Sequence, residues 1–372
     1  MVNGFQYKQS VSDRATPDAF DEGASVENSE SSRSNKRAKI AFTERKYWRK
    51  DFLAFSIEKI FEQVARLLDS DKFEAAVVKV PHGNSLAAII KNLIRFKKPI
   101  ADVYHITGQI HYMALVLPRD RTVLTIHDLA FLEDEQSRGV KRFLLKKLFL
   151  DLPIRRAKFV TAVSETTKKS ILGNSPSAYD RVRVIHNPIQ EHFLSGNPKT
   201  FSAAYPTILQ IGITENKNIA RLIEALKEIP CRLKIVGNMT AELERQLKAS
   251  GVDYVSALGL DDDQMKAAYE EADIVSFCST YEGFGLPIIE AQAMYRPVLT
   301  SDIDPMKEVS GGAAYLADPF DVESIRKGIL TIINDDQFRE EIIERGRENI
   351  QRFLPNKIAA EYERLYDEIL KR

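Results

Sequence analysis

Short apolar runs alternate with amphipathic helical patterns along most of this 372-residue chain, and this alternation constrains the fold more than any other feature. Short apolar runs bounded by polar residues or glycine are typical of strands buried on both faces of a parallel sheet. Strands that alternate with helices indicate an α/β fold, and the length indicates more than one core. The predicted strands form one series at 75–80, 103–106, 122–126, 159–163 and 182–185, and a second at 207–211, 233–236, 273–277, 298–300 and 313–316.

The two series predict two Rossmann-like domains in tandem, joined by a polar stretch. Residues 1–36 are rich in Ser, Asp, Glu and Asn and lack apolar periodicity, which is typical of a disordered tail. We expect order to begin with a strand at 39–42, followed by a linker at 43–55 and a helix that starts near Ser56. The predicted units are an N-terminal domain at 37–195, a C-terminal domain at 200–355 and a terminal helix at 356–372.

Composition excludes several classes of protein. Lys plus Arg and Asp plus Glu number 53 each, so no net charge favours nucleic acid. No apolar run approaches the roughly 20 residues needed to span a bilayer, and no signal-peptide pattern opens the chain. Cys231 and Cys278 form no C-x-x-C pair, which fits a reducing compartment. We therefore predict a soluble cytoplasmic protein that binds no nucleic acid.

The strongest local signal for chemistry is the segment 279–290, STYEGFGLPIIE, which directly follows a predicted strand. Its two glycines let the backbone approach a ligand closely. Pro287 suits the first turn of a helix, whose N-terminus offers unpaired N–H donors to a diphosphate. Glu282 and Glu290 would flank that anion site, where carboxylates suit sugar hydroxyls better than phosphates. The alternative is a tight strand-to-helix turn with a helix-capping Glu.

This segment resembles the signature of the family 4, or group 1, glycosyltransferases, in which two Glu residues are separated by seven others. The resemblance extends over residues 37–370 and is strongest in 207–319. It implies the GT-B architecture, in which two Rossmann-like domains face each other across a cleft and the terminal helix packs back on the N-terminal domain. It also implies transfer of a hexose-type sugar from an NDP-sugar donor to an acceptor hydroxyl, with retention, in cell-surface glycan or glycolipid biosynthesis. Neither a metal nor a cofactor is expected.

The resemblance also implies roles for individual residues. Glu282 would contact hydroxyls of the transferred sugar, and Glu290 would accept hydrogen bonds from the ribose. Lys217, at the start of an amphipathic helix, would bind the diphosphate; its alternative is an ordinary surface lysine. The other donor-binding residues implied are Gly212, Gly283, Phe284, Gly285 and Leu286.

His127 follows the predicted strand at 122–126, so we expect its side chain to point into the cleft. The resemblance places a histidine here close to the transferred sugar, and we predict that His127 acts in catalysis together with Glu282, as a hydrogen-bond donor that positions the sugar. The alternative is a structural histidine. Because retaining transfer builds charge on the leaving phosphate, donors and cations held there are the main catalytic contribution.

Two features depart from the family pattern near the expected phosphate site. Ile213 stands where many members have Arg, and residues 43–50 stand where many have a Gly-Gly loop. Arg45 and Arg49 are candidates to replace both elements. The alternatives are a loop reshaped for another acceptor and a solvated basic run.

Residues 138–158 carry many Lys and Arg residues, interleaved with apolar ones, against a single acid, Asp151. An amphipathic basic helix can lie on an anionic membrane, which would suit a lipid-linked acceptor and peripheral contact with the inner membrane face. The alternative is a core-packed helix with a solvated basic face.

Two other functions remain open at this point. One is a sugar-nucleotide epimerase of the same architecture, which would need no acceptor. The other is a non-catalytic nucleotide-sugar-binding scaffold, which the two departures from the family pattern would support.

Overall fold

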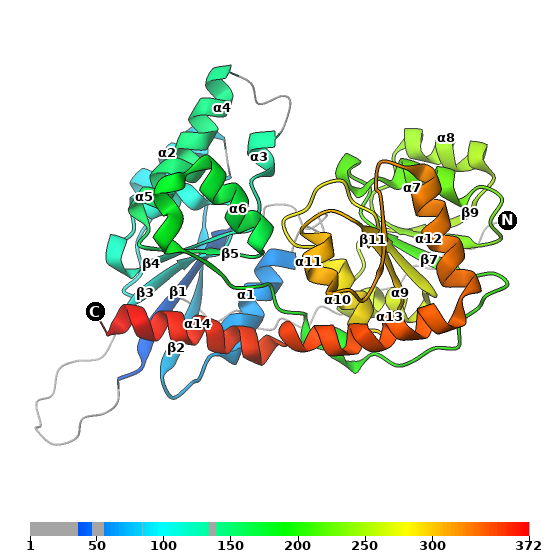
Figure 1. Cartoon of the computed structure of the whole chain (residues 1–372). Helices are drawn as coiled ribbons and strands as arrows, with labels where there is room; N and C mark the ends of the chain where they lie inside the picture. Colours follow the sequence, from blue (N-terminus) through cyan, green and yellow to red (C-terminus); the bar gives the residue numbers. More distant parts are fainter. Residues whose placement is uncertain (1–35, 47–55, 84, 134–138, 372) are drawn as a thin grey trace, which may run out of the picture.

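The computed structural model describes residues 36–46, 56–83, 85–133 and 139–371, so the predicted tail lies outside the described residues except for Lys36. The described chain forms two α/β halves that lie beside each other (Figure 1). Each half is built on a parallel six-stranded sheet, which confirms the predicted fold class.

The N-terminal sheet has the strand order β2-β1-β3-β4-β5-β6. Its strands are β1 (Ala38–Arg45), β2 (Phe73–Val80), β3 (Val103–Ile106), β4 (Thr122–Ile126), β5 (Phe159–Ala162) and β6 (Val182–Val184). The helices of this half are α1 (Ser56–Leu67), α2 (Leu86–Arg95), α3 (Ala130–Glu133), α4 (Gly139–Lys146), α5 (Leu152–Arg156) and α6 (Glu165–Asn174). β1 pairs with β2 along its whole length, so the linker predicted to start at residue 43 was wrong up to Arg45. The charged residues Glu44 and Arg45 interrupt the apolar pattern, so the sequence did not indicate that the strand continues to Arg45.

The C-terminal sheet has the order β12-β11-β10-β7-β8-β9. Its strands are β7 (Thr207–Ile211), β8 (Arg232–Val236), β9 (Asp253–Ala257), β10 (Ile274–Phe277), β11 (Val298–Ser301) and β12 (Tyr315–Ala317). The helices of this half are α7 (Ile219–Leu226), α8 (Ala241–Ser250), α9 (Asp262–Glu271), α10 (Leu286–Ala293), α11 (Met306–Ser310), α12 (Val322–Asn334) and α13 (Asp336–Asn349). Strand order reverses between β7 and β10, and between β1 and β3 in the other sheet. Ligands bind at such switch points, beyond the carboxyl ends of the strands.

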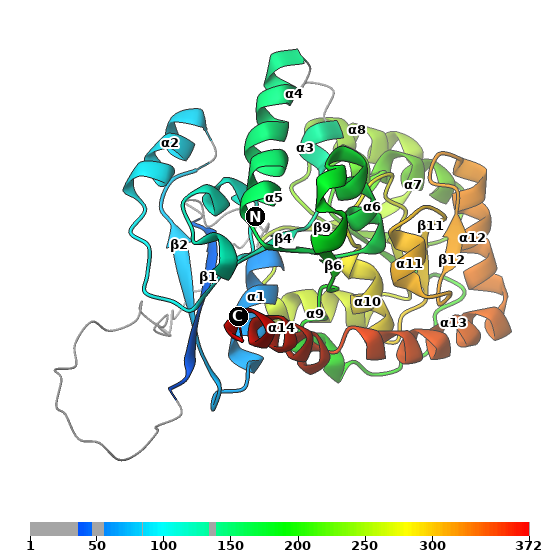
Figure 2. The ribbon, with the colours of Figure 1, turned by 60° about the vertical axis from the view of Figure 1, so that its left-hand side comes forward.

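The chain crosses between the halves twice. The first crossing follows β6, and the second leads from α13 into α14 (Pro355–Leu370). The two crossing segments are joined, because the backbone N–H of Ile189 donates to the carbonyl of Phe353 at 2.9 Å. Helices α13 and α14 run along one side of both halves (Figures 1 and 2). α14 therefore packs on the N-terminal half, where its Tyr362 and Tyr366 join the core around Phe42 and Phe61.

Candidate active site

A cavity of about 370 Å³ lies between the two halves, at the carboxyl ends of β4, β7 and β10. Its volume falls in the range of small-molecule sites. Residues from α1, the loop after β4 and the first crossing face residues from the C-terminal half across it. The predicted site residues all line this cavity: His127, Gly212, Lys217, Glu282, Gly283, Phe284, Gly285, Leu286 and Glu290. The structure thus brings them together, while their chemical roles stay predictions.

The loop between β10 and α10 forms one wall of the cavity. Gly285 has φ 108°, a left-handed conformation that glycine adopts at little cost, and α10 begins directly after it. Pro287 occupies the first turn, as predicted. The start of α10 lines the cavity, so its N–H groups and positive dipole end face the space where an anion would bind.

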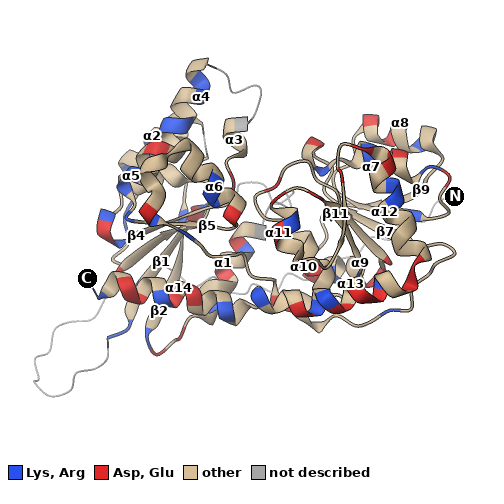
Figure 3. Ribbon diagram, in the orientation of Figure 1, with Lys and Arg blue, Asp and Glu red and all other residues tan. Residues whose placement is uncertain are grey.

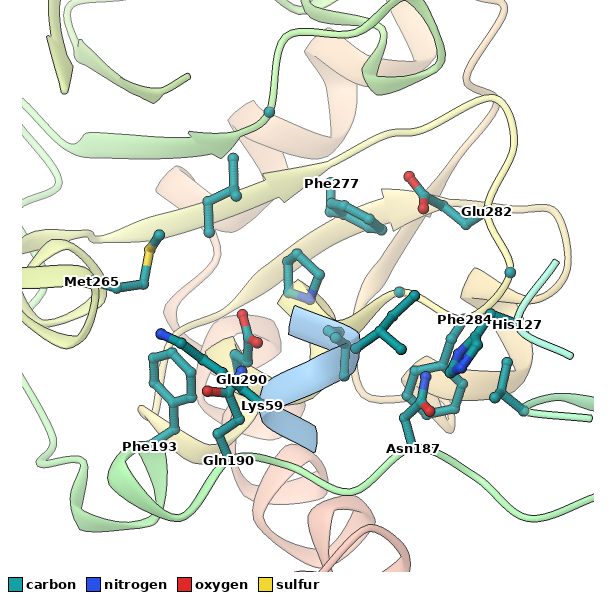
Figure 4. A pocket seen from close by; sticks show the side chains of 18 of the residues that line it. Lys59, His127, Asn187, Gln190, Phe193, Met265, Phe277, Glu282, Phe284 and Glu290 are labelled. Carbon is teal, nitrogen blue, oxygen red and sulfur yellow. The ribbon is translucent and has the colours of Figure 1, made fainter. Parts of the chain in front are cut away.

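Phe284 lines the cavity and also packs on the second crossing segment. It is buried and meets Phe353 edge to face, with ring centroids 5.6 Å apart. Figure 4 shows Phe284 beside His127 at one end of the cavity.

Lys217 and Glu282, predicted to bind different parts of the donor, form an ion pair. The Lys217 Nζ atom lies 2.6 Å from Oε1 of Glu282 and 4.7 Å from the ring centroid of Phe277. Asn216 holds the same oxygen of Glu282 at 3.3 Å and the carbonyl of Tyr281 at 3.0 Å. A diphosphate near Lys217 would compete with Glu282 for the ammonium group.

Glu290 is buried in the second turn of α10 and has one strong partner. The hydroxyl of Tyr269, on α9, donates to its Oε2 at 2.5 Å. Burial raises the pKa of Glu290 to about 7, against the opposing effects of the Tyr269 hydrogen bond and the charge of Lys217. Near neutral pH this carboxyl group therefore exists in both protonation states.

His127 is buried at the edge of the cavity, with its ring held on two sides. Nε2 lies 2.8 Å from the carbonyl oxygen of Thr107, and Phe61 meets the ring edge to face at 5.8 Å. Burial lowers the pKa of His127 to about 4, so the ring is neutral at pH 7. A neutral imidazole has one N–H, and the Thr107 carbonyl accepts it, which leaves Nδ1 as an acceptor. This geometry favours an acceptor role over the predicted donor role.

The far end of the cavity was not identified from the sequence. Phe193, Leu260 and Met265 make it apolar, and Figure 4 shows Phe193, Met265 and Lys59 at this end. An ion pair between Lys59 of α1 and Asp262 of α9 joins the two halves beside it. Asp261 caps α9 at this end, and its side chain accepts from the Gln264 N–H. Phe193 lies far in the sequence from Leu260 and Met265, so no local pattern marks these apolar residues together.

The two departures from the family pattern have different structural accounts. Ile213 packs on Gly237, where an added Cβ atom would lie 2.9 Å from Ile213 Cγ2, so this position supports the core of the C-terminal half. Arg45 ends β1, and Arg49 lies outside the described residues. Replacement of the missing elements by these two arginines stays a prediction.

Two Rossmann-like halves with a ligand-sized cavity at their strand ends are the arrangement called the GT-B architecture. Residues 198–349 match the family described as Glycosyl transferases group 1, and residues 58–193 match the family described as Glycosyltransferase Family 4. The chain belongs to the family 4, group 1 glycosyltransferases, which confirms the resemblance seen in its sequence.

Relatives and solved structures agree with this assignment. O-antigen chain mannosyltransferase B of Escherichia coli is 25% identical over 256 residues, 63% of this chain and 67% of that protein. Phosphatidyl-myo-inositol mannosyltransferase of Mycobacterium leprae is 28% identical over 202 residues, 50% of this chain and 53% of that protein. The E. coli mannosyltransferase WbdA is 27% identical over 70% of this chain, but the match spans only 36% of WbdA.

Two solved structures share the architecture over most of the chain. Sucrose-phosphate synthase of Thermosynechococcus elongatus superposes with a TM-score of 0.71 at 18% identity, covering 90% of this chain and all of that one. Anabaena HepE, solved with UDP and glucose, gives 0.68 at 17% identity, covering 89% and 100%. These likenesses confirm the predicted GT-B fold.

Proposed function

We propose that this glycosyltransferase moves a hexose-type sugar from an NDP-sugar donor to an acceptor hydroxyl, with retention, in cell-surface glycan or glycolipid synthesis. The observation that carries the proposal is the convergence of Lys217, Glu282, Glu290 and the start of α10 on one cavity, with His127 opposite. The mannosyltransferases among its relatives support mannose as the first sugar to test.

The cavity offers a distinct place for each part of the donor. The diphosphate would lie between Lys217 and the first N–H groups of α10, where cation and helix dipole both favour it. The sugar would lie between Glu282 and His127. The Nδ1 atom of His127 would accept a hydrogen bond from a sugar hydroxyl. Glu290 would bind the ribose, and the apolar end lined by Phe193 would take the base.

Charge on the leaving phosphate is the chemical problem of this reaction. Lys217 is placed to neutralise it, and the N–H groups at the start of α10 add donors that need no reorganisation. In this scheme the protein's own groups supply the positive charge, and the donor is a substrate. We therefore propose that transfer requires neither a metal ion nor a cofactor.

Calorimetric titration with UDP, GDP, ADP, dTDP and CMP, in the presence of EDTA, tests the donor site. We expect selective binding of one nucleotide and a loss of at least about tenfold in affinity for Lys217→Ala, because a charge-assisted contact to phosphate is removed. Lys227→Ala is the control, since Lys227 pairs with Glu224 on the surface at the other end of α7. Absence of binding by every nucleotide, with or without added Mg²⁺, would contradict the proposal.

We also propose that α4 contacts an anionic membrane that carries a lipid-linked acceptor. Val140, Phe143 and Leu144 on this helix are exposed, whereas Leu145 packs on the N-terminal core. Beyond the helix, Phe149, Leu150 and Ile154 belong to that core, as the alternative of a core-packed segment expects. Basic residues occupy the same helix (Figure 3), and α2 of the same half exposes Leu86, Ile90 and Ile94. Of the described helices, none combines the length and apolarity needed to cross a membrane.

Sedimentation with vesicles tests this contact. Wild-type protein should bind vesicles rich in phosphatidylglycerol more tightly than vesicles of phosphatidylcholine. Lys141→Glu/Arg142→Glu should weaken the first interaction by at least about tenfold, since each basic residue near an anionic surface contributes about 1 kcal/mol. The control Lys248→Glu/Lys327→Glu makes the same charge change at exposed positions of the other half. Equal effects of both double variants would count against α4.

A further inference from the structure

The two halves of the chain meet backbone to backbone beside the cavity. Gly283 lies so close to the loop after β4 that an added Cβ atom would stand 2.1 Å from the carbonyl oxygen of His127. No side chain fits in that space without moving one of the two loops. Because Glu282 adjoins Gly283 in the chain, this contact sets how far Glu282 lies from His127.

Two hydroxyl groups at the start of α6 hold this contact. Ser164 Oγ accepts a hydrogen bond from the Thr167 N–H at 3.0 Å. Its own proton has two acceptors within reach, the Gly283 carbonyl at 2.8 Å and Thr167 Oγ1 at 3.0 Å, and the carbonyl is the nearer. Thr167 Oγ1 lies 3.1 Å from the Gly283 carbonyl and 3.2 Å from that of His127, so one proton is shared between the two halves. The two side chains are 0% and 4% exposed, and hydrogen bonds strengthen where water is excluded.

Capping of α6 does not by itself require this arrangement. A helix cap uses only the acceptor oxygen of the capping side chain. Thr240 caps α8 in that way, accepting from the Leu243 N–H at 3.1 Å with its side chain exposed. At Ser164 the hydroxyl proton is in addition directed across to the other half of the molecule.

A second contact fastens the same end of α6 to the C-terminal half. The carboxylate of Glu308, on α11, accepts from the backbone N–H of Glu165 at 3.1 Å and from Nε2 of His186 at 3.2 Å. Burial alone would raise the pKa of Glu308, but these hydrogen bonds outweigh it and hold the pKa below its usual value. The group is therefore charged near pH 7, and the start of α6 is held at two points.

We infer that Ser164 and Thr167 are positioning residues for sugar transfer, which fix the loop of His127 against the loop of Glu282. The inference rests on the proposed function, in which His127 and Glu282 contact the sugar. Lys217 and Glu290 lie wholly in the C-terminal half, so nucleotide binding does not depend on this contact. Loss of the two hydroxyls should therefore reduce kcat and leave nucleotide affinity unchanged.

The test uses the full chain with Ser164→Ala, Thr167→Val and the double variant. Thr240→Ala is the control for loss of a cap, and Thr166→Val is the control for a Thr-to-Val change one position away. For each protein we would measure the affinity for the nucleoside diphosphate that binds wild type best. Transfer of sugar to water from the matching NDP-sugar would give kcat and KM, and X-ray scattering with saturating nucleotide would give the radius of gyration.

We expect nucleotide affinity within about twofold of wild type, and a fall in kcat of about 10- to 100-fold, which is the effect of small misplacements of reacting groups. The radius of gyration should increase in the double variant, and Thr167→Ser should recover most of kcat because it keeps the hydroxyl. The controls should match wild type.

Retention of wild-type kcat by the double variant would overturn the inference and leave the proposed function intact. Equal losses of nucleotide affinity and kcat would also overturn it, because they indicate a general structural role. Failure of the wild-type protein to bind any nucleotide would instead overturn the proposed function itself.

Discussion

At the scale of single residues, Glu290 is a cavity group whose charge changes near neutral pH. Its carboxyl is buried, takes a hydrogen bond from Tyr269 and has its pKa raised to about 7. A raised carboxyl pKa favours the neutral form in the folded protein, so the free protein loses stability as the pH rises from 4.5 toward 7. Ribose hydroxyls donate to a carboxylate, so a bound nucleotide favours the charged form.

Nucleotide affinity should therefore increase by about tenfold between pH 6 and pH 8, the range over which a group with a pKa of about 7 becomes fully charged. Calorimetric titrations at pH 6, 7 and 8 would measure it. The terminal phosphate of the nucleotide also titrates, near pH 6. Glu290→Gln supplies the baseline for that effect, and a wild-type curve parallel to the Glu290→Gln curve would contradict the prediction.

At the scale of elements, α14 completes the N-terminal core through a buried polar chain. The Tyr366 hydroxyl bonds Nδ1 of His105 at 2.7 Å, and Nε2 of His105 bonds Thr125 at 2.7 Å. Phe61 meets the rings of both His105 and His127 edge to face. Burial lowers the pKa of His105 to about 3, so the imidazole in this series of hydrogen bonds is neutral at pH 7.

Tyr366→Phe should lower the free energy of unfolding by about 1–2 kcal/mol, because a nitrogen of His105 loses its partner in a buried place. Urea denaturation followed by circular dichroism would measure the loss. Tyr179→Phe removes a hydroxyl from an exposed side chain and should change the free energy of unfolding by less than about 0.5 kcal/mol. The same small change for both variants would contradict a stabilising role for the hydroxyl.

Most elements were predictable from the sequence because their strands are continuous apolar runs. β4, for example, is buried along its whole length and was predicted to the residue. β9 was missed because it lies at the sheet edge, with exposed and partly exposed side chains that interrupt the apolar pattern. The end of β1 was missed because Glu44 is buried despite its charge.

The site was predictable only where one segment carries its geometry. Gly283, Gly285 and Pro287 mark the loop before α10 because glycine and proline have local backbone requirements. The bonds of Ser164 and Thr167 to Gly283 join residues more than a hundred positions apart, so they depend on how the halves sit together. The Tyr269 partner of Glu290 likewise requires the placement of α9 against α10.

At the scale of the whole molecule, the N-terminal half depends on the C-terminal end of the chain for its core. Truncation after Leu354 removes five large buried side chains: Ile358, Tyr362, Leu365, Tyr366 and Ile369. Burial of such side chains contributes about 1.5–3 kcal/mol each, and their sum approaches the stability of a domain. The N-terminal half should therefore be unfolded in the truncated protein, while the C-terminal half still melts cooperatively.

Differential scanning calorimetry would measure this. The full chain should give a transition with the enthalpy of both halves, and the truncated chain one with only that of the C-terminal half. Leu365→Ala, in the full chain, should give an intermediate case by lowering the melting temperature of the N-terminal half alone. An unchanged enthalpy after truncation would show that the N-terminal core does not need α14.

The paired crossing also limits how the two halves can move. A single linker would allow the two halves to rotate about several axes. Two linkers that are hydrogen-bonded to each other, as at Ile189 and Phe353, should favour rotation about one hinge axis and resist twisting. If the two halves open and close about these connections, we expect the loops of Gly283 and His127 to come back to the same contact each time.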